Sequence, residues 1–327
     1  MPAEHAGPDG PGTARGFVHH ACLYGSDEEF LAMAVPFVRA GLAAGEPVLA
    51  ATTPANIELL RAALGDGAHA LDTAETAYFG RRPVERVSAF LRYHDRRARP
   101  GGRLRMIAEP VWSGRSGRQT AEWKRMESGL NLLLAGLPLW MICPYDTRTV
   151  PPDVAEAACA THPARLDGER VTPCAAYRDP AHYTASVLPP DLPPPPSAAL
   201  APPTASLPAV RRFARARGAA AGLTGERLAL AALAVHEAAG HLLADGAHVT
   251  LSAWEEPGVL VYDLWRPGPL SAPVPALAGY APPGAAPGGE DGLWLARRLS
   301  ESLDVRSGDD ATRITLRVAG PTDAEAL

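Results

Sequence analysis

The sequence predicts two domains of mixed secondary structure: an α/β domain with a mostly parallel sheet, followed by an α+β domain. The chain has 327 residues, about twice the length of a typical domain. Over its first half, short apolar segments alternate with helical patterns, which favours a parallel sheet with helices on both faces. A proline-rich stretch then ends this alternation, and the second half begins with two helical patterns before its strands.

Changes in composition set the predicted domain boundaries. Residues 1–15 are polar and rich in glycine and proline, so we expect a disordered tail. The first domain spans residues 16–165. A proline-rich linker follows over residues 166–206, because a run such as LPPPP cannot join a helix or a central strand. The second domain spans residues 207–320, and residues 321–327 form a short tail.

Charge and hydropathy exclude several classes of protein. The net charge is −5, which gives no electrostatic reason to expect direct binding of nucleic acid. The longest apolar run, Leu130–Cys143, is interrupted by Gly136 and Pro138 and is too short to cross a bilayer. The N-terminal residues lack the apolar segment of a signal peptide. We therefore expect a soluble, cytoplasmic protein with no membrane partner.

The four cysteines are scattered along the chain and form no CxxC pair; they are Cys22, Cys143, Cys159 and Cys174. This usage fits a reduced compartment better than a disulfide framework. Cys159 and His162 are three residues apart, with Cys143 in the same region, but we do not favour a zinc site there. No metal site is predicted.

The predicted elements of the first domain follow a regular strand–helix order. Strands are expected at residues 17–24, 47–52, 70–72, 104–109 and 139–144, and helices at 27–44, 56–64, 83–97 and 120–135. Ser26 and Glu29 form a capping box at the start of the first helix. Ligands of such sheets bind beyond the carboxyl ends of the strands, where Glu109 and Asp146 lie. The chain has no GxxxxGK(S/T) or GxGxxG phosphate-binding motif.

Five segments of the first domain carry a family resemblance. They are HACLYGSDEEFLAMAVPFVRAGLAAGEPVLAA from His20, GRRP from Gly80, IAEPVWSGR from Ile107, EWKRMESGLN from Glu122 and CPYD from Cys143. Together they resemble the MEDS domain, a sensory module of regulators from methanogens and methylotrophs. The resemblance covers residues 16–165. It implies a RecA/KaiC-like parallel-sheet fold without a P-loop, and a small ligand of unknown identity.

The same resemblance suggests the residues that line the sensory pocket: His20, Tyr24, Asp27, Glu109 and Glu127. The family often has a His-Glu pair where this chain has Met126 and Glu127, so any role of that imidazole is lost here. The alternative interpretation is that these five are buried polar residues that serve only the fold.

The second domain begins with helices and continues with strands. Helices are expected at residues 210–218, 228–244 and 292–302, strands at 249–254, 259–265, 303–307 and 312–318, and a long loop at 267–289. The first helix is basic, and its arginines form either a solvated face or a surface for an acidic partner. The second carries Glu237 and His241 on one face, which we expect to point inward. The order predicts helices on one face of a mixed sheet.

A second family resemblance lies in the segments AVHEAAGHLLADGA, GGEDGLWLARRL and RSGDDATRITLRV. They resemble the histidine kinase/Hsp90-like ATPase fold, an α+β sandwich, and within it the anti-sigma-factor kinases of the RsbW type. In that family a helix presents a catalytic Glu and, four residues on, an Asn that holds Mg²⁺. A DxG turn binds adenine, and a glycine-rich lid contacts the phosphates. The resemblance assigns catalysis to Glu237, and nucleotide contacts to the positions of His241, Arg266, Gly268, Gly288, Gly289, Gly292 and Thr312.

Two of these positions hold residues of the wrong chemistry for ATP. His241 stands where the family has Asn, and a neutral imidazole is a poor ligand for Mg²⁺. Arg266 stands where the DxG turn has Asp, and a guanidinium has no acceptor for the adenine amino group. Asp263 cannot substitute, because a strand places residues three apart on opposite faces. The sequence therefore disfavours ATP and Mg²⁺ as cofactors.

Two functions follow from these resemblances. The first is a regulator of the anti-sigma-factor type, in which a sensor module is joined to a degenerate ATPase domain that binds a sigma factor or its STAS-type antagonist. The second is an active serine-protein kinase that uses Glu237 to phosphorylate an anti-anti-sigma partner. A histidine autokinase is less favoured, because no histidine in a four-helix-bundle context precedes the second domain. RsbW-type kinases are often dimers, so the resemblance implies a homodimer.

Overall fold

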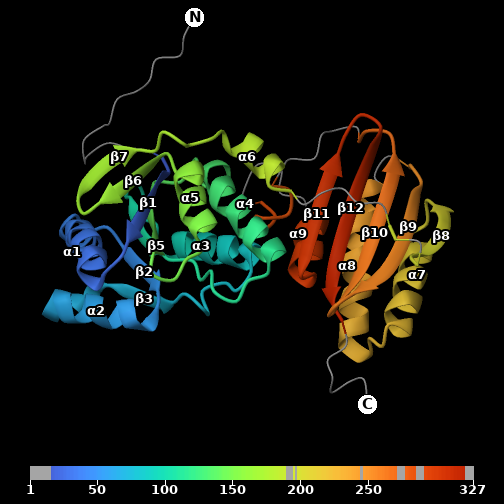
Figure 1. Ribbon diagram of the computed structural model, residues 1–327, viewed down its shortest axis with the longest axis horizontal. Helices are drawn as coiled ribbons and strands as arrows, with labels where there is room; N and C mark the ends of the chain where they lie inside the picture. The colour runs from blue at the N-terminus through green and yellow to red at the C-terminus, as the bar shows by residue number, and fades with distance from the viewer. Residues whose placement is uncertain are drawn as a thin grey trace, which may run out of the picture. The chain divides into compact units, whose positions relative to one another are not determined.

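The computed structural model describes residues 16–188, 194–195, 197–243, 246–270, 277–284 and 291–320. The chain divides into two compact units, residues 1–187 and 188–327. Each unit has its own sheet and its own hydrophobic core (Figure 1). None of the described helices combines the length and the apolar character that a membrane span needs.

The first unit is built on a seven-stranded sheet with the order β3-β2-β4-β5-β1-β6-β7. Its strands are β1 (Val18–Tyr24), β2 (Val48–Thr52), β3 (Asp72–Glu75), β4 (Leu104–Ala108), β5 (Leu139–Asp146), β6 (Ala164–Asp167) and β7 (Arg170–Pro173). All neighbours run parallel except β6 and β7. Every residue of β2 and β4 is buried, as expected of central parallel strands covered on both faces. The predicted parallel sheet is therefore confirmed.

Helices cover both faces of this sheet. They are α1 (Asp27–Ala43), α2 (Pro54–Leu64), α3 (Pro83–Arg97), α4 (Gly117–Leu133), α5 (Pro152–Thr161) and α6 (Pro180–Ser186), with a 3-10 helix, η1, at Gly65–Ala70. In Figure 1, α1 and α2 lie on one side of the sheet, and α3, α4 and α5 lie on the other. Ser26 caps α1 as predicted, accepting a hydrogen bond from the Glu29 amide, while the Glu29 carboxylate accepts one from Gly25.

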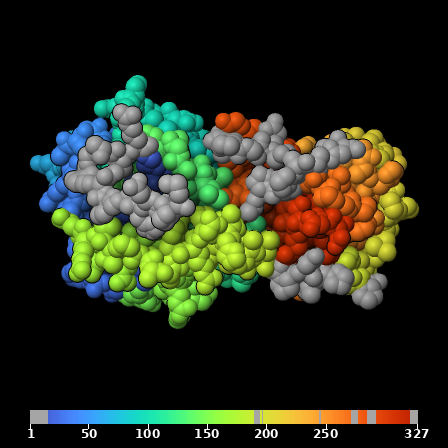
Figure 2. All heavy atoms as spheres, turned by 90° about the horizontal axis from the view of Figure 1, so that it is seen from above, coloured from blue at the N-terminus to red at the C-terminus, as the bar shows by residue number. Residues whose placement is uncertain are grey.

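The first unit extends further along the chain than its sequence predicts. The expected linker begins at residue 166, but β6, β7 and α6 occupy most of residues 164–186 and form a strip on the surface of this unit, yellow-green in Figure 2. The cause is the alternation in β6, where Leu166 is buried in the core and the side chains on either side of it are exposed. The predicted tails and part of the proline run lie outside the described residues.

The second unit contains a five-stranded sheet with the order β11-β12-β10-β9-β8. Its strands are β8 (Ala199–Thr204), β9 (Val249–Glu256), β10 (Val259–Pro267), β11 (Ser302–Ser307) and β12 (Ala311–Ala319). The prediction of a mixed sheet is wrong, because each of these neighbours is antiparallel. Short connections explain the difference: β9 and β10 are joined only by Pro257 and Gly258, which leaves no room for a crossover.

Strand β8 is an unpredicted edge strand drawn from the expected linker. It contains Pro202 and Pro203, and its pairing with β9 is irregular between Ala201 and Thr204. Proline has no amide hydrogen to donate, so the edge and an irregularity are the places where a sheet tolerates it. The linker between the two sheets is thereby shorter than the sequence indicates.

Three helices pack on one face of the second sheet: α7 (Leu207–Ala220), α8 (Gly225–Leu242) and α9 (Asp291–Leu299). Leu260, Tyr262 and Leu264 of β10 point into this core, and the Tyr262 hydroxyl donates to Ala214 O at 2.7 Å. The other face is polar, since Asp263 accepts hydrogen bonds from Arg313 and Thr315 there. Asp263 thus lies on the face opposite to the helices.

Candidate functional site

A buried polar network lies at the carboxyl edge of the first sheet. The Glu109 carboxylate, just beyond β4, accepts hydrogen bonds from the Tyr24 hydroxyl at 2.7 Å and from Asn56 Nδ2 at 2.9 Å. Thr52 Oγ1 also donates to it, and Asn56 reaches Tyr24 Oη at 3.0 Å. Burial and the Glu109 charge raise the pKa of Tyr24. Two of the predicted sensory residues, Tyr24 and Glu109, are therefore in direct contact.

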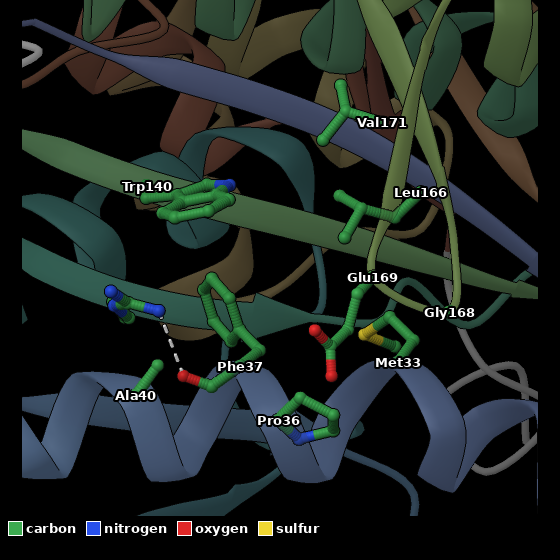
Figure 3. Close-up of a pocket in the computed structure, with 10 residues that line it drawn as sticks. Met33, Pro36, Phe37, Ala40, Trp140, Leu166, Gly168, Glu169 and Val171 are labelled. Atoms are coloured by element: carbon green, nitrogen blue, oxygen red, sulfur yellow. Dashed lines mark hydrogen bonds between the residues drawn. The ribbon is translucent and has the colours of Figure 1, made fainter. Parts of the chain in front are cut away.

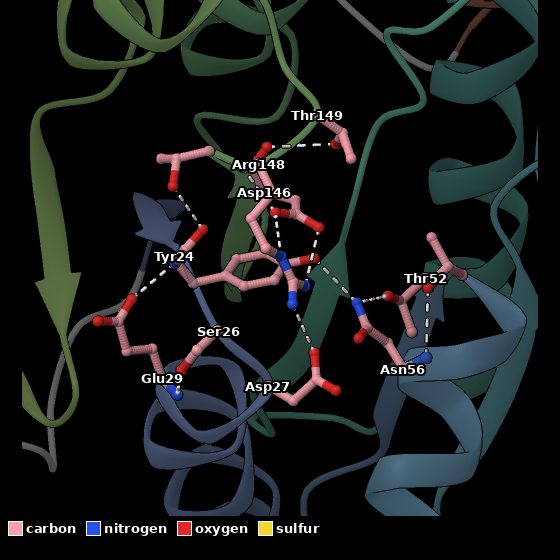
Figure 4. Close-up of polar contacts among 12 residues, drawn as sticks. Tyr24, Ser26, Asp27, Glu29, Thr52, Asn56, Asp146, Arg148 and Thr149 are labelled. Carbon is pink, nitrogen blue, oxygen red and sulfur yellow. Dashed lines mark hydrogen bonds and ion pairs between the residues drawn. The ribbon is translucent and has the colours of Figure 1, made fainter.

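Asp27 lies at the rim of this network (Figure 4). The Arg148 guanidinium pairs with Asp27 at 3.0 Å and with Asp146 at 2.8 Å, and its carbon lies 5.7 Å from the centre of the Tyr24 ring. The hydrogen bond from Arg148 lowers the pKa of Asp146. The two carboxylates and the arginine form a polar cover over the tyrosine.

The other two predicted sensory residues lie elsewhere. His20 points to the same face of β1 as Tyr24, but near the amino end of the strand, where Trp140 Nε1 donates to its Nδ1 at 3.2 Å. Burial lowers the pKa of His20 to about 4. Glu127 is on α4, against the opposite face of the sheet. The structure therefore brings Tyr24, Glu109 and Asp27 together and places His20 and Glu127 apart from them.

Glu127 belongs to a buried cluster with His19, Cys143 and His162, whose ligand atoms all lie within 4.8 Å of one another. His19 Nε2 is 3.4 Å from Cys143 Sγ and 3.9 Å from Glu127 Oε2, and His162 Nε2 is 3.7 Å from the same carboxylate oxygen. None of the four residues is more than 3 % exposed. Four different elements contribute: β1, α4, β5 and the residue that ends α5.

Strand register explains how two residues far apart in sequence meet in this cluster. β1 and β5 pair in parallel, with His19 opposite Met141. Side chains two residues apart on a strand share a face, so Cys143 points to the same side of the sheet as His19. The adjacent His20 points to the other side. His19 and His20 are adjacent in sequence, but the register of β1 against β5 shows that they lie on opposite faces of the sheet and make different contacts.

Hydrogen bonds fix the tautomers of both imidazoles. Asn131 donates through Nδ2 to Ser128 O and Thr161 O, so its Oδ1 accepts from His19 Nδ1 at 3.2 Å. His162 Nδ1 lies 2.9 Å from Ala158 O, which can only accept. Each Nε2 therefore carries a lone pair directed into the cluster.

Burial sets the charges of the cluster in the absence of a cation. It lowers the pKa of His162 to about 3 and raises the pKa of Glu127 to about 7, a rise that the positive charge of Arg86 opposes. Cys143 and Tyr145 hydrogen-bond to the Glu127 carboxyl. Within the described part of the chain, Glu127 Oε2 and His162 Nε2 are nevertheless buried without a hydrogen-bond partner.

A separate apolar pocket of about 320 Å³ opens between α1, the amino end of β5 and the β6–β7 hairpin (Figure 3). Its lining is Met33, Pro36, Phe37, Ala40, Arg105, Trp140, Leu166, Gly168, Glu169 and Val171. The Arg105 guanidinium stacks on Phe37 and Trp140, bonds to Phe37 O at 3.0 Å and pairs with Glu46. No predicted sensory residue lines this pocket, although His20 contacts Trp140.

In the second unit, Glu237 lies beside the start of α9. A Cβ added at Gly292 would be 3.2 Å from both the carbonyl oxygen and Oε2 of Glu237, so a glycine permits this approach. The expectation that the face of Glu237 and His241 points inward is wrong, because both residues are only half-buried and Leu230 and Leu233 on the same face are exposed. The small residues of α8, such as Ala234 and Ala238, form the core-facing side instead.

Arg266 has a structural role at the position expected to bind adenine. Arg266 is 7 % exposed, and its guanidinium donates to Leu242 O at 3.0 Å and to Pro269 O at 3.2 Å. Leu242 is the last residue of α8, so the arginine supplies a donor to a helix end that has no further amide to use. These contacts do not fit a nucleotide base, which needs an acceptor at this place.

Two further predicted nucleotide contacts, Thr312 and Gly268, lie at the end of β10 that carries Arg266. Thr312 is buried opposite Arg266 in the β10–β12 register and contacts Ser307 Oγ at 3.2 Å. Gly268 has a φ of 76° and donates to Asp310 O at 2.7 Å, which defines the turn after β10. Gly288 and Gly289 lie outside the described residues.

A comparison with known families identifies one domain. Residues 18–163 match the family described as MEDS, the methanogen/methylotroph, DcmR sensory domain. A MEDS domain is thus detected in the first unit, and it indicates a signalling role. No curated protein matches the chain.

Proposed function

We propose that the chain is a cytoplasmic signalling regulator of the anti-sigma-factor type. The first unit senses a small ligand, and the second binds a sigma factor or its STAS-type antagonist without using ATP. The sensory half of this proposal is supported by the MEDS match. For the second half, the support is the order of elements in the second unit, with helices on one face of a sheet, and its local resemblance to RsbW-type proteins.

The same architecture supports the fold assignments that we propose for the two units. A mostly parallel sheet between two layers of helices, without a phosphate-binding loop motif, is compatible with a RecA/KaiC-like domain. A single layer of helices on an antiparallel sheet is compatible with a histidine kinase/Hsp90-like α+β sandwich. A fold alone does not define a function, so these two assignments concern the fold only.

The observation that carries the proposal of an ATP-independent second unit is the engagement of Arg266. Its guanidinium is buried and bonded to the end of α8 where the family binds adenine. To admit an adenine amino group there, the arginine would have to leave two backbone carbonyls, and its charge would still offer no acceptor. The residue therefore serves the scaffold.

Calorimetric titration of the full chain with ATP, with and without Mg²⁺, tests this proposal. We expect no heat of binding at millimolar ATP from a sample whose fold is verified by circular dichroism. Micromolar binding that depends on Mg²⁺ would overturn the ATP-independent form. Arg266→Gln serves as a second sample, because it removes the charge and supplies an acceptor without shortening the side chain greatly.

An active serine-protein kinase is the second candidate function. The proximity of the Glu237 carboxylate to Gly292 at the start of α9 supports it, since a catalytic carboxylate would have to lie near phosphates bound at this helix N-terminus. Transfer of phosphate from labelled ATP to a STAS-type protein would support this alternative, provided that Glu237→Gln abolishes the transfer. The same variant should leave partner binding unchanged if the first candidate holds.

The basic face of α7 is the surface that we propose for an acidic protein partner. Arg211, Arg212 and Arg215 are exposed on this helix. Binding of recombinant sigma factors and STAS-type proteins to the full chain can be measured directly, with Arg211→Glu/Arg212→Glu as the test variant. Charge reversal on exposed Arg96 and Arg99, in the first unit, is the matched control for a general effect of charge. Equal affinity of the two variants would exclude α7 from the interface.

The apolar pocket beside α1 is the place that we propose for the sensory ligand. Its volume of about 320 Å³ suits a small molecule, and its aromatic and aliphatic lining suits an apolar one. The half-buried indole of Trp140 provides a fluorescent reporter in its wall. A ligand in the pocket should quench this fluorescence, and Val171→Trp, which fills the pocket from the hairpin, should abolish binding.

A further inference from the structure

We propose that His19, Glu127, Cys143 and His162 form a binding site for a divalent transition-metal ion, with Zn²⁺ as the expected ion. The four side chains converge from four elements of the first unit on one buried point. The inference goes beyond the signalling function and does not depend on it, because it rests only on this cluster. It also revises the expectation from the sequence that the chain has no metal site.

The spacing of the ligand atoms suits a tetrahedral ion. Metal–ligand bonds of about 2.0–2.3 Å place the ligands of a tetrahedral zinc site about 3.3–3.8 Å apart. The separations of 3.4, 3.7 and 3.9 Å that join His19, Cys143, Glu127 and His162 are close to this range. The widest separation in the group is within 4.8 Å, so side-chain shifts of about an ångström would complete the geometry.

The two imidazoles are already prepared as ligands. Each donates its Nδ1 hydrogen to an oxygen outside the cluster, Asn131 Oδ1 for His19 and Ala158 O for His162. This arrangement fixes the tautomer, orients the ring and leaves Nε2 free to coordinate, as outer hydrogen bonds do around metal-bound histidines. Asn131 is itself held by two backbone carbonyls.

Two acceptor atoms in the cluster lack a hydrogen-bond partner, and a cation would supply one for both. Within the described residues, Glu127 Oε2 and His162 Nε2 are fully buried and accept no hydrogen bond. A buried acceptor without a partner destabilises the folded protein, because its hydrogen bonds to water are lost and not replaced. A purely structural polar cluster would be expected to pair these atoms, whereas coordination to one ion uses both.

The mixture of ligand atoms selects the class of metal. A thiolate is a soft ligand and two imidazoles are borderline ligands, so the set suits Zn²⁺, Co²⁺ or Fe²⁺ and not Mg²⁺ or Ca²⁺, which prefer oxygen. A thiolate and a carboxylate together would neutralise a doubly charged ion. Four protein ligands fill a tetrahedron, and the site is closed to water, as in structural zinc sites.

Cys159, which the sequence associates with His162, is not part of the group. Its thiol is hydrogen-bonded to Cys174 instead. The partner of His162 in the cluster is Cys143, on a different element. Close spacing in sequence is therefore misleading here, and the site is formed by the sheet.

Replacement of the metal by Co²⁺ gives a direct test in the full chain. The protein is stripped with a chelator, its fold is checked by circular dichroism, and Co²⁺ is added. We expect one equivalent to bind, with the intense visible bands of tetrahedral Co²⁺ and a near-ultraviolet charge-transfer band from the Cys143 thiolate. One equivalent of Zn²⁺ should then bleach both bands. A folded protein that shows neither band would overturn the proposal.

Matched variants assign the bands to residues. Cys143→Ser should abolish the charge-transfer band, whereas Cys22→Ser, which removes another buried thiol from the neighbouring strand, should retain it. His19→Gln should weaken binding of Co²⁺ at least tenfold, whereas His20→Gln should not. The assignment would be contradicted if Cys143→Ser kept the charge-transfer band, or if Cys22→Ser lost it to the same extent.

The wild-type protein provides a test that no folding defect can obscure. Added Zn²⁺ should raise the melting temperature of the metal-free full chain, because binding to the folded state alone stabilises it. Mg²⁺ at the same concentration should have no effect. Equal effects of the two ions would indicate weak surface binding and would overturn the proposed site.

Discussion

The two units differ in where they place polar groups. The first unit has helices on both faces of its sheet and buries a group of ionisable side chains that includes Glu109 and Glu127. The second has helices on one face only, with an apolar core beneath them and a polar network around Asp263 on the other face. A sheet covered on both sides can enclose a site from water, whereas a sheet covered on one side offers a surface. The first architecture therefore suits a ligand or an ion, and the second suits a protein partner.

Both units nevertheless use buried arginines in the same way. Arg86 in the first unit donates to the carbonyl oxygens of Thr76, Phe79 and Glu109. In the second unit, Arg297 donates to Leu303 O and Ala278 O. A guanidinium with several donors can join loops whose carbonyls have no strand or helix partner. We expect the first unit to depend more strongly than the second on such interior polar contacts.

The largest effect is expected for Arg86→Ala. The change removes all of these donors at a residue that is 1 % exposed and leaves a cavity, although Glu109 O still accepts from Thr76 Oγ1. Lost hydrogen bonds of buried groups cost about 1–3 kcal/mol each and the cavity adds to this, so we expect a loss of about 3–5 kcal/mol. Hydrogen exchange measured by mass spectrometry on β4 peptides would report this loss for the first unit alone. Exposed Arg81→Ala is the control, and equal protection in the two variants would contradict the prediction.

Two glycines provide a matched comparison between the units. Gly80 in the first and Gly279 in the second have φ values of 89° and 77°, and an added Cβ would lie within 2.6 Å of backbone atoms in each case. Strain and overlap together should cost each unit about 2–3 kcal/mol on substitution by alanine. Gly284→Ala isolates the strain, because φ is 72° there but nothing lies within 4 Å. Hydrogen exchange on peptides of each unit measures the loss of stability in all three variants. If Gly279→Ala cost no more than Gly284→Ala, the predicted overlap of the added Cβ with backbone atoms would be refuted.

Acid should destabilise the metal-free first unit. Burial lowers the pKa of His20 to about 4, below the value of about 6.5 in an unfolded chain. The unfolded state then binds the proton more readily, so the contribution to stability is complete above pH 6.5 and is lost as the pH falls towards 4. Between pH 7 and pH 5 we expect a loss on the order of 1–2 kcal/mol, part of which His20→Gln should remove. Melting curves at the two pH values test this, and the same pH dependence in wild type and variant would exclude His20.

The smallest effect is expected for Tyr24→Phe. The change removes one hydrogen bond to Glu109, but Asn56 Nδ2 and Thr52 Oγ1 continue to donate to that carboxylate. The cost should be about 1 kcal/mol in the first unit. Exposed Tyr78→Phe is the control in the same assay. A loss above about 3 kcal/mol would mean that the network acts as a single unit.

Local patterns in the sequence predict much of this fold. The bounds of α3 agree with the prediction to the residue, and the Ser26 cap of α1 is present, because helical periodicity and capping are local signals. Strands β6, β7 and β8 are missed because they are short and carry few apolar residues, and β8 contains two prolines. Their pairing depends on neighbours far away in the sequence.

The candidate sites show the same limit more sharply. The sequence identifies Tyr24 and Glu109, which lie at predictable strand ends. It places His20 in one pocket with Glu127, whereas His19 is the histidine beside Glu127, because a step of one residue along a strand exchanges the two faces of the sheet. It also assigns Arg266 to a nucleotide position by resemblance, whereas the bond to Leu242 O is visible only once α8 and β10 are packed.

The two prolines of β8 have a consequence for growth of the second sheet. An open edge normally invites an additional strand from another chain, through its unpaired amides and carbonyls. Consecutive amides of a strand point to opposite sides, so one of Pro202 and Pro203 removes an amide from the open edge of β8 and the other removes one from the side that pairs with β9. A foreign strand, from a regulatory partner or from an aggregating copy, should therefore pair more readily with the opposite edge of the sheet. That edge is strand β11, between Ser302 and Ser307.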